Sequence, residues 1–205
     1  MIELYHAPLS RSVRVRWLLE ELELPYEIHP MEVKPESLQT PAYRAIHPAA
    51  KVPAIRDGEQ VLFESGAILQ YLLERYGHGR LEPGPGTPER PLYWQWFHFA
   101  EATLMPPLGE IAQHSFMRPK EERISALVPD ARRRAERALD AVEPALEGRS
   151  FLLGGSEESF SAADVMMGYS VKLAELLRCL DESRPNLRRY LARLETRPAF
   201  QKALA

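Results

Sequence analysis

The sequence predicts a mixed α/β domain followed by an all-helical domain. Short apolar runs of strand type alternate with helical apolar spacing as far as Tyr76, and from Glu89 onward the apolar residues recur only at helical spacing. Between these patterns, residues 77–91 concentrate glycine and proline, which is typical of a linker. We therefore expect domains at residues 1–78 and 91–205, joined by a linker at residues 79–90.

The composition limits the classes of protein to consider. A chain of 205 residues is long enough for two small domains, and a net charge of −3 gives no reason to expect nucleic-acid binding. Cys179 is the only cysteine, so there is no disulfide framework or zinc cluster, and we expect it to be buried. The chain starts without the features of a secretory signal, and no apolar run reaches membrane-spanning length. We expect a cytoplasmic protein with no metal, membrane or nucleic acid as partner.

The first part of the α/β domain reads as strand, helix and strand. Residues 2–6 alternate weakly and predict a strand, and residues 11–22 predict a helix with one apolar face. Residues 26–33 predict a second strand, in which Pro30 favours an edge or a bulge because proline has no N–H to donate. Residues 34–46 are irregular, with a short helix at most.

The segment between His47 and Tyr76 predicts a loop, a hairpin and a helix. Asp57 and Gly58 signal the hairpin turn, because glycine accepts the positive φ that such turns need. Residues 61–63 predict the second strand of the hairpin, and Glu64-Ser65-Gly66 opens a helix with one apolar face.

The apolar spacing in the second domain predicts helices throughout. Pro106 and Pro107 should kink or interrupt the first of them, and a break is expected before Pro129. Ser161 and Asp164 have the spacing of a capping box at the start of the central apolar helix. The expected helices span residues 89–114, 119–146, 165–180, 186–195 and 198–204.

Two residues of the first domain indicate a binding pocket. Pro53 stands where a strand should begin, so it withholds a ladder donor and is a candidate cis-proline. Ser65 stands at a helix N-terminus, where free backbone N–H groups and the helix dipole attract anions. Together they outline a pocket for a small, extended, anionic ligand.

The chain as a whole resembles the glutathione S-transferase family. The matching segments are SRSVRVRWLLEEL, HPAAKVPAI, FESGAILQYL, SFSAADV and PNLRRYLARLETRPAF, and their order and spacing carry the resemblance. The resemblance implies a thioredoxin-like N-terminal domain and an all-helical C-terminal domain. YWQWFHFAEATLMPPL further resembles a bacterial and fungal subgroup that uses serine rather than tyrosine chemistry.

The resemblance also implies a set of residues that bind glutathione as co-substrate. The backbone of Val52 would pair with the cysteinyl part, while Glu64 would face the ammonium and Ser65 the carboxylate of the γ-glutamyl part. The glycyl carboxylate would lie near the lysine of the loop before Val52, where Ala50 stands in place of a common glycine and allows a different loop path. The complete set is Gln39, Lys51, Val52, Pro53, Glu64 and Ser65.

Ser10 is the expected catalytic residue, donating a hydrogen bond to the glutathione sulfur. A free thiol titrates near pH ~8.5, and lowering that pKa by about two units needs about 2.7 kcal/mol. A hydrogen bond to a charged acceptor supplies about 1.5–3 kcal/mol, and the following helix N-terminus adds about 0.3–1 kcal/mol. Ser12 and Tyr5 are the alternatives for this role, and Arg11 would add positive potential if it turned inward.

The function implied by the resemblance is a homodimeric glutathione transferase for detoxification. Its thiolate would attack a small apolar electrophile in a second pocket, for which Met105 and Leu108 are candidates, although core packing is an equal alternative for both. A glutathione-dependent disulfide or peroxide reductase is a second hypothesis. A non-enzymatic protein that binds ligands or partners on the same fold is a third.

Overall fold

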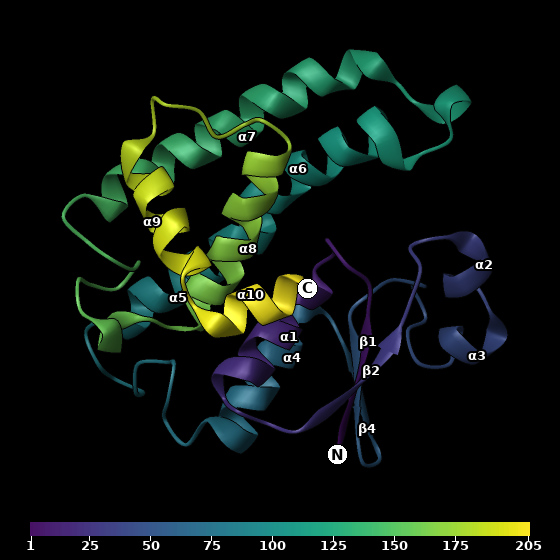
Figure 1. Ribbon diagram of the computed structural model, residues 1–205, viewed down its shortest axis with the longest axis horizontal. Coiled ribbons are helices and arrows are strands. Elements are labelled where there is room, and N and C mark those ends of the chain that lie inside the picture. Colours follow the sequence, from purple (N-terminus) through teal and green to yellow (C-terminus); the bar gives the residue numbers. More distant parts are fainter. The chain divides into compact units, whose positions relative to one another are not determined.

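The computed structural model describes residues 1–205, which divide into two compact units. The first unit contains Met1–Leu81 and Glu195–Ala205, and the second contains Glu82–Leu194. A four-stranded sheet in the order β2-β1-β3-β4 lies at the centre of the first unit (Figure 1). Its strands are β1 (Ile2–His6), β2 (Tyr26–Pro30), β3 (Ala54–Asp57) and β4 (Gln60–Phe63).

The pairing of the strands determines which loops are neighbours. Strand β1 is parallel to β2 and antiparallel to β3, which pairs antiparallel with β4. The register places Tyr5 opposite Ala54 and Ala54 opposite Phe63. The end of β1, the start of β3 and the end of β4 therefore lie at the same end of the sheet.

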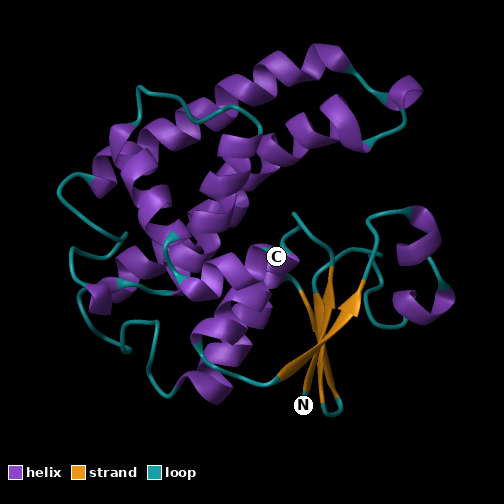
Figure 2. Ribbon diagram, in the orientation of Figure 1, coloured by secondary structure: helices purple, strands orange, loops and turns teal.

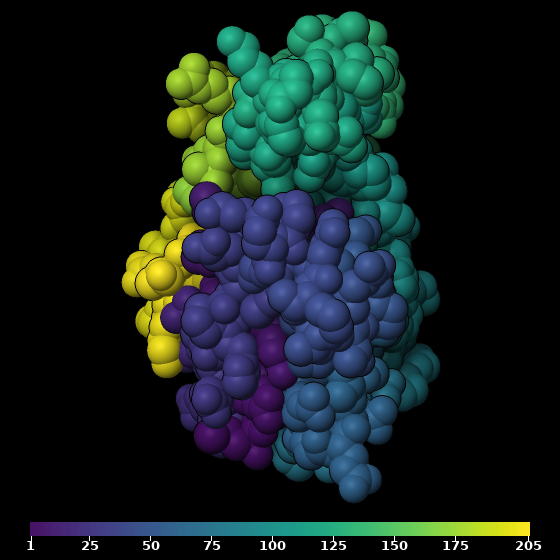
Figure 3. Space-filling view, turned by 90° about the vertical axis from the view of Figure 1, so that its right-hand side faces the viewer, coloured from purple at the N-terminus to yellow at the C-terminus, as the bar shows by residue number.

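Helices cover both faces of this sheet, as Figures 1 and 2 show. Helices α1 (Ser12–Glu21) and α4 (Ser65–Leu72) lie on one face, and the short helices α2 (Pro35–Leu38) and α3 (Pro41–Arg44) lie on the other. Figure 3 looks onto the second face, which the indigo segment with α2 and α3 largely covers. The α/β architecture expected for this part of the chain is thus confirmed.

The first unit departs from the expected elements in two segments and confirms one glycine turn. Strand β2 ends at Pro30 rather than at residue 33, because its partner β1 ends at His6, whose carbonyl accepts from the Met31 N–H at 2.7 Å. Residues 34–46 form α2 and α3 rather than one short helix, and each of these helices has a proline in its first turn. Gly58 has a φ of 62° between the paired residues Asp57 and Gln60, as expected for the hairpin turn.

The second unit is all-helical, as expected. Its α-helices are α5 (Arg90–Phe99), α6 (Met105–Ala112), α7 (Val128–Val142), α8 (Ala162–Leu176) and α9 (Pro185–Glu195), the last of which ends in the first unit. None of the helices is both long enough and apolar enough to cross a lipid bilayer.

The helix that contains Pro106 and Pro107 is not broken there but changes locally from α-helical to π-helical geometry. A π-helical turn over Ala100–Leu104 joins α5 to α6, and a second one over Gln113–Met117 follows α6. Because the two prolines have no N–H groups, they cannot donate to the carbonyls of the preceding turn. The wider turn before them accommodates that loss without a break.

Helix α8 is closed at both ends by the motifs of its sequence. The expected capping box is present, with the Asp164 carboxylate accepting from the Ser161 backbone N–H at 2.9 Å. The helix ends at Leu176 rather than at residue 180, because Arg178 adopts a φ of 57°. The N–H of Cys179 then donates to the Ala174 carbonyl at 2.8 Å, which is the pattern of a Schellman motif. Cys179 is buried beyond the helix end, as expected.

The last helix, α10 (Pro198–Leu204), groups with the first unit, whereas the sequence assigned all of residues 91–205 to the helical domain. Its Phe200 ring lies 4.2 Å, between centroids, from the Trp17 ring of α1. The Arg197 guanidinium holds both carboxylate oxygens of Glu21, at 2.7 and 2.8 Å. Local helical periodicity gives no information on such a return to the start of the chain, because the contacts join distant residues.

Candidate functional site

Ser10 lies in the loop between β1 and α1 and is half-buried. Helix α1 begins at Ser12 rather than at residue 11, so Ser10 precedes the residue in the N-cap position. The Ser10 hydroxyl donates to the Ala7 carbonyl at 2.8 Å, and its oxygen accepts from the Ser12 backbone N–H at 3.2 Å. The loop therefore holds the hydroxyl in place through backbone groups on both sides.

A hydrogen-bonded chain runs from Ser10 into the interior. The Ser10 and Ser12 hydroxyl oxygens are 2.7 Å apart, and the Ser12 oxygen lies 2.8 Å from Nδ1 of His6. Ser12 is 0% exposed and His6 is 5% exposed. Burial, assisted by the nearby Arg16 charge, lowers the pKa of His6 to about 4, so the imidazole is neutral at physiological pH.

The second part of the site is the turn into β3. The peptide bond between Val52 and Pro53 is cis. The strand ladder begins only at Ala54, so the backbone of Val52 lies outside it and is available to an extended ligand. The Tyr43 hydroxyl donates to the Lys51 carbonyl at 2.6 Å, which anchors the loop, and Ala50 adopts a φ of 53° of the kind that glycine favours.

The third part is the entry into α4. Glu64 adopts a φ of 74° immediately before the helix, a conformation that costs energy for a residue with a side chain and that is concentrated at functional sites. Ser65 begins the helix and is 3% exposed. Its backbone N–H belongs to the first turn, where N–H groups have no partner within the helix.

Sequence reasoning did not find Arg14, which lies behind this helix terminus. The Arg14 side chain is 0% exposed and donates from Nη1 to the Ser65 hydroxyl at 3.2 Å. A buried guanidinium beside a helix N-terminus makes the local potential strongly positive. The only sequence signal was an arginine between Val13 and Val15 on a helix with an apolar face.

Sequence reasoning also assigned no role to His6 or His47. The His47 side chain is 3% exposed, and its Nδ1 atom has no hydrogen-bond partner. The ring lies 4.6 Å from the ring of Phe63, and burial lowers the pKa of His47. A buried nitrogen without a partner is uncommon in folded proteins and is suited to a polar ligand.

The register of the sheet brings the three parts together. Ser10 follows β1, Pro53 precedes β3 and Glu64 follows β4, and these strand ends are neighbours because Tyr5, Ala54 and Phe63 are in register. The resulting surface combines a hydroxyl, an open backbone segment and a positively polarised helix terminus. Such a surface suits a small, extended, anionic ligand.

The remaining candidate residues differ in exposure and contacts. Gln39 is exposed just after α2, and Lys51 is exposed in the loop before Val52. The Tyr5 ring stacks on His29 at 4.9 Å between centroids, which supports a packing role. Arg11 is half-buried. In the second unit, Met105 and Leu108 are buried, as core packing requires, and their role in a second pocket stays a prediction.

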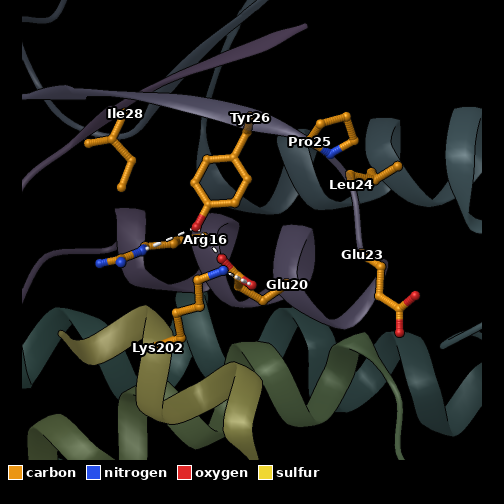
Figure 4. A pocket seen from close by; sticks show the side chains of 8 residues that line it. All are labelled: Arg16, Glu20, Glu23, Leu24, Pro25, Tyr26, Ile28 and Lys202. Atoms are coloured by element: carbon orange, nitrogen blue, oxygen red, sulfur yellow. Dashed lines mark hydrogen bonds and ion pairs between the residues drawn. The ribbon is translucent and has the colours of Figure 1, made fainter.

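A surface hollow of the first unit lies at the opposite end of the sheet, with a volume of about 690 Å³ (Figure 4). Four of its polar side chains are paired: Arg16 donates to the Tyr26 hydroxyl at 3.3 Å, and Lys202 holds Glu20 at 2.8 Å. No group of three or more His, Cys, Asp or Glu side chains in the chain is arranged to hold a metal ion.

Comparison with known proteins identifies relatives of both units. Family models for the N-terminal and C-terminal domains of glutathione S-transferase match residues 4–85 and 125–193. Disulfide-bond oxidoreductase YfcG of Escherichia coli is 31% identical over 100% of this chain and 94% of its own length. Glutathione S-transferase 3 of Zea mays is 29% identical over 100% of this chain and 93% of its own.

Solved structures show the same likeness in three dimensions. Glutathione transferase URE2P6 of Phanerochaete chrysosporium, determined in complex with oxidized glutathione, superimposes with a TM-score of 0.85 at 27% identity. The superposition covers 98% of this chain and 94% of that protein.

Proposed function

The chain belongs to the glutathione S-transferase family, and we propose that it binds glutathione and transfers its thiolate to a small apolar electrophile. The observation that carries the proposal is the meeting of Ser10, Pro53 and Glu64 at one end of the sheet. The proposal includes a homodimer, which the family resemblance suggests and which light scattering of the purified protein tests.

The proposed ligand lies along the surface made by these three parts. The γ-glutamyl carboxylate accepts from the hydroxyl and N–H of Ser65, in the positive potential of the α4 terminus and Arg14. The Glu64 carboxylate faces the ligand ammonium. The Val52 backbone pairs with the cysteinyl residue beside Pro53, and the glycyl carboxylate lies toward Lys51, with Gln39 nearby.

The proposed chemistry begins with ionisation of the bound thiol. Its proton leaves to solvent, and the Ser10 hydroxyl donates a hydrogen bond to the resulting thiolate, which lowers the pKa of the thiol. A sulfur lone pair then forms a carbon–sulfur bond with the electrophile. The leaving group departs with the electrons of its own bond to that carbon, and Ser10 keeps its proton throughout.

A second reaction is favoured by the similarity to the Escherichia coli disulfide-bond oxidoreductase. In that reaction, two glutathione thiols reduce a disulfide substrate to two thiols and leave joined as glutathione disulfide. The protein supplies binding but no redox group, which agrees with Cys179 being the only cysteine and being buried in the helical unit.

Calorimetric titration with glutathione and with glutathione disulfide tests the binding step. We expect binding in the micromolar to millimolar range for the wild type, weakening at least tenfold for Glu64→Ala. Glu59→Ala is the matched control, because Glu59 is an exposed glutamate in the hairpin turn at the other end of β4. Absence of binding in the wild type would overturn the proposal.

Two assays on the same preparation separate the two reactions. An aromatic halide with glutathione measures transfer, and a mixed disulfide of glutathione measures reduction. Turnover of the halide that is lost in Ser10→Ala supports the transferase. Turnover of the mixed disulfide alone would assign the reductase instead.

A further inference from the structure

The series of hydrogen bonds that connects Ser10 to His6 has no part in the proposed reaction. It involves Ser10 in the loop, Ser12 at the start of α1 and His6 at the end of β1. The Ala7 carbonyl lies 2.8 Å from the Ser10 oxygen and 3.0 Å from the Ser12 oxygen. Either hydroxyl group can therefore donate to this carbonyl, and one donor is enough to satisfy it.

The number of available hydrogens determines which hydroxyl group donates to the Ala7 carbonyl. Each serine has one hydroxyl hydrogen. If Ser12 donates to Nδ1 of His6, only Ser10 is left to satisfy the Ala7 carbonyl, and the Ser10 hydrogen points away from any ligand. If Nδ1 itself carries the hydrogen, it donates to Ser12, and the Ser12 hydrogen can then point to the Ala7 carbonyl or to the Ser10 oxygen, which is 2.7 Å away. The Ser10 hydrogen is then available to a bound sulfur.

We propose that His6 is a positioning residue that carries its hydrogen on Nδ1 when glutathione is bound and thereby releases the Ser10 hydroxyl to the thiolate. This inference rests on the proposed function. The distances of 2.8 Å from His6 to Ser12 and 3.0 Å from Ser12 to the carbonyl fit both bonds of this arrangement. Ser12 also accepts from the Ala7 N–H at 3.1 Å, so its oxygen has partners whichever way its hydrogen points.

The environment of His6 keeps the ring uncharged, so that it adopts one of its two neutral tautomers. Burial lowers the pKa of His6 to about 4, so the ring carries a single N–H at neutral pH. A charged imidazole would donate from both nitrogens, whereas the neutral ring donates from only one. The position of one hydrogen on a buried ring thus sets the direction of a hydroxyl at the surface.

The first test measures the pKa of the thiol of glutathione bound to the full-length protein. The ultraviolet absorbance of the thiolate is followed against pH. Ser12→Ala leaves Ser10 alone to satisfy the Ala7 carbonyl. We therefore expect it to raise the pKa of the bound thiol by about one to two units, as much as Ser10→Ala does. Ser12→Thr, which restores a hydroxyl, should return the pKa toward the wild-type value.

A matched pair of variants tests His6. Asparagine and leucine have nearly the same shape, but only the asparagine amide can donate near the Nδ1 position. We expect His6→Leu to raise the pKa of the bound thiol and His6→Asn to keep most of the wild-type value. Thermal melts verify that each variant is folded. If His6→Leu does not fold, the Ser12 variants and the spectroscopic test below still decide the question.

Nitrogen-15 NMR of the wild-type ring reads the tautomer directly, since the two neutral forms give different nitrogen shifts. The inference predicts the Nδ1–H form with glutathione bound, and the Nε2–H form in that complex would overturn it. An unchanged thiol pKa in Ser12→Ala, alongside a raised one in Ser10→Ala, would also overturn it while leaving the proposed function intact. Failure of the proposed function would appear differently, as loss of glutathione binding or an unchanged thiol pKa in Ser10→Ala.

Discussion

The guanidinium of Arg14 donates a hydrogen bond to the hydroxyl of Ser65 at 3.2 Å from a completely buried position. This bond joins the first turn of α1 to the first residue of α4. Burying a guanidinium is costly, and the cost is offset when an anion comes close enough to pair with the charge. We therefore expect Arg14 to contribute to the proposed site for the γ-glutamyl carboxylate.

Replacing Arg14 should weaken ligand binding as well as the fold. Arg14→Met keeps much of the side-chain volume but removes the buried donor to the Ser65 hydroxyl, so we expect the free energy of unfolding to fall by about 1–3 kcal/mol. The glutathione affinity should fall about tenfold or more, because the carboxylate loses a nearby positive charge. Calorimetry and urea unfolding measure the two effects.

Arg16→Met is the control for that change, because Arg16 lies on the same helix and its Nε pairs with Tyr26 near the opposite end of the sheet. It should leave the glutathione affinity unchanged. Equal loss of affinity in both variants would assign the effect to a general change of charge or of helix α1.

The backbone conformation of Glu64 predicts that replacing this residue by glycine increases stability relative to alanine, while either replacement weakens glutathione binding. Glycine adopts a φ of 74° without steric cost, so Glu64→Gly should raise the free energy of unfolding by about 1 kcal/mol over Glu64→Ala. Both variants should lose glutathione affinity, because both lack the carboxylate proposed to face the ammonium. Urea unfolding and calorimetry on the pair check this. Equal stability of the two variants would show that the conformation stores no strain.

Much of the fold was predictable from short-range patterns. The hairpin turn at Gly58 and the capping box of Ser161 and Asp164 appear in the structure as expected, because neighbours in sequence determine them. The return of α10 to the first unit was not predictable, since the contact between Trp17 and Phe200 joins the two ends of the chain.

The candidate site was predictable only where its residues carry a local signature. Pro53 and Ser65 stand out because one should begin a strand and the other begins a helix. Arg14, His6 and His47 gave no such signal, since a polar residue within an apolar segment looks the same whether it faces water or the interior. Only the packed structure shows that all three are buried.

The buried imidazole of His6 makes stability depend on pH. The pKa is about 4 in the folded protein and about 6.5 in an unfolded chain, so the unfolded state binds the proton more strongly. Its contribution is complete above pH ~6.5 and is lost as the pH falls toward 4, amounting to about 2 kcal/mol between pH ~7 and ~5. Urea unfolding at these two pH values measures it. A loss of the same size in His6→Leu would assign the pH dependence to other groups.

The contact between α1 and α10 predicts that the C-terminal helix contributes to the stability of the first unit. Phe200 is fully buried against Trp17, so Phe200→Ala should lower the free energy of unfolding by about 3–5 kcal/mol through lost contacts and a cavity. Arg197→Ala should cost less, because it removes an ion pair that is not fully buried. Lys202→Ala should cost under about 1 kcal/mol, since Lys202 is largely exposed where it pairs with Glu20. Tryptophan fluorescence during urea unfolding follows this contact. An effect of Phe200→Ala as small as that of Lys202→Ala would mean that α10 contributes little to the packing of this unit.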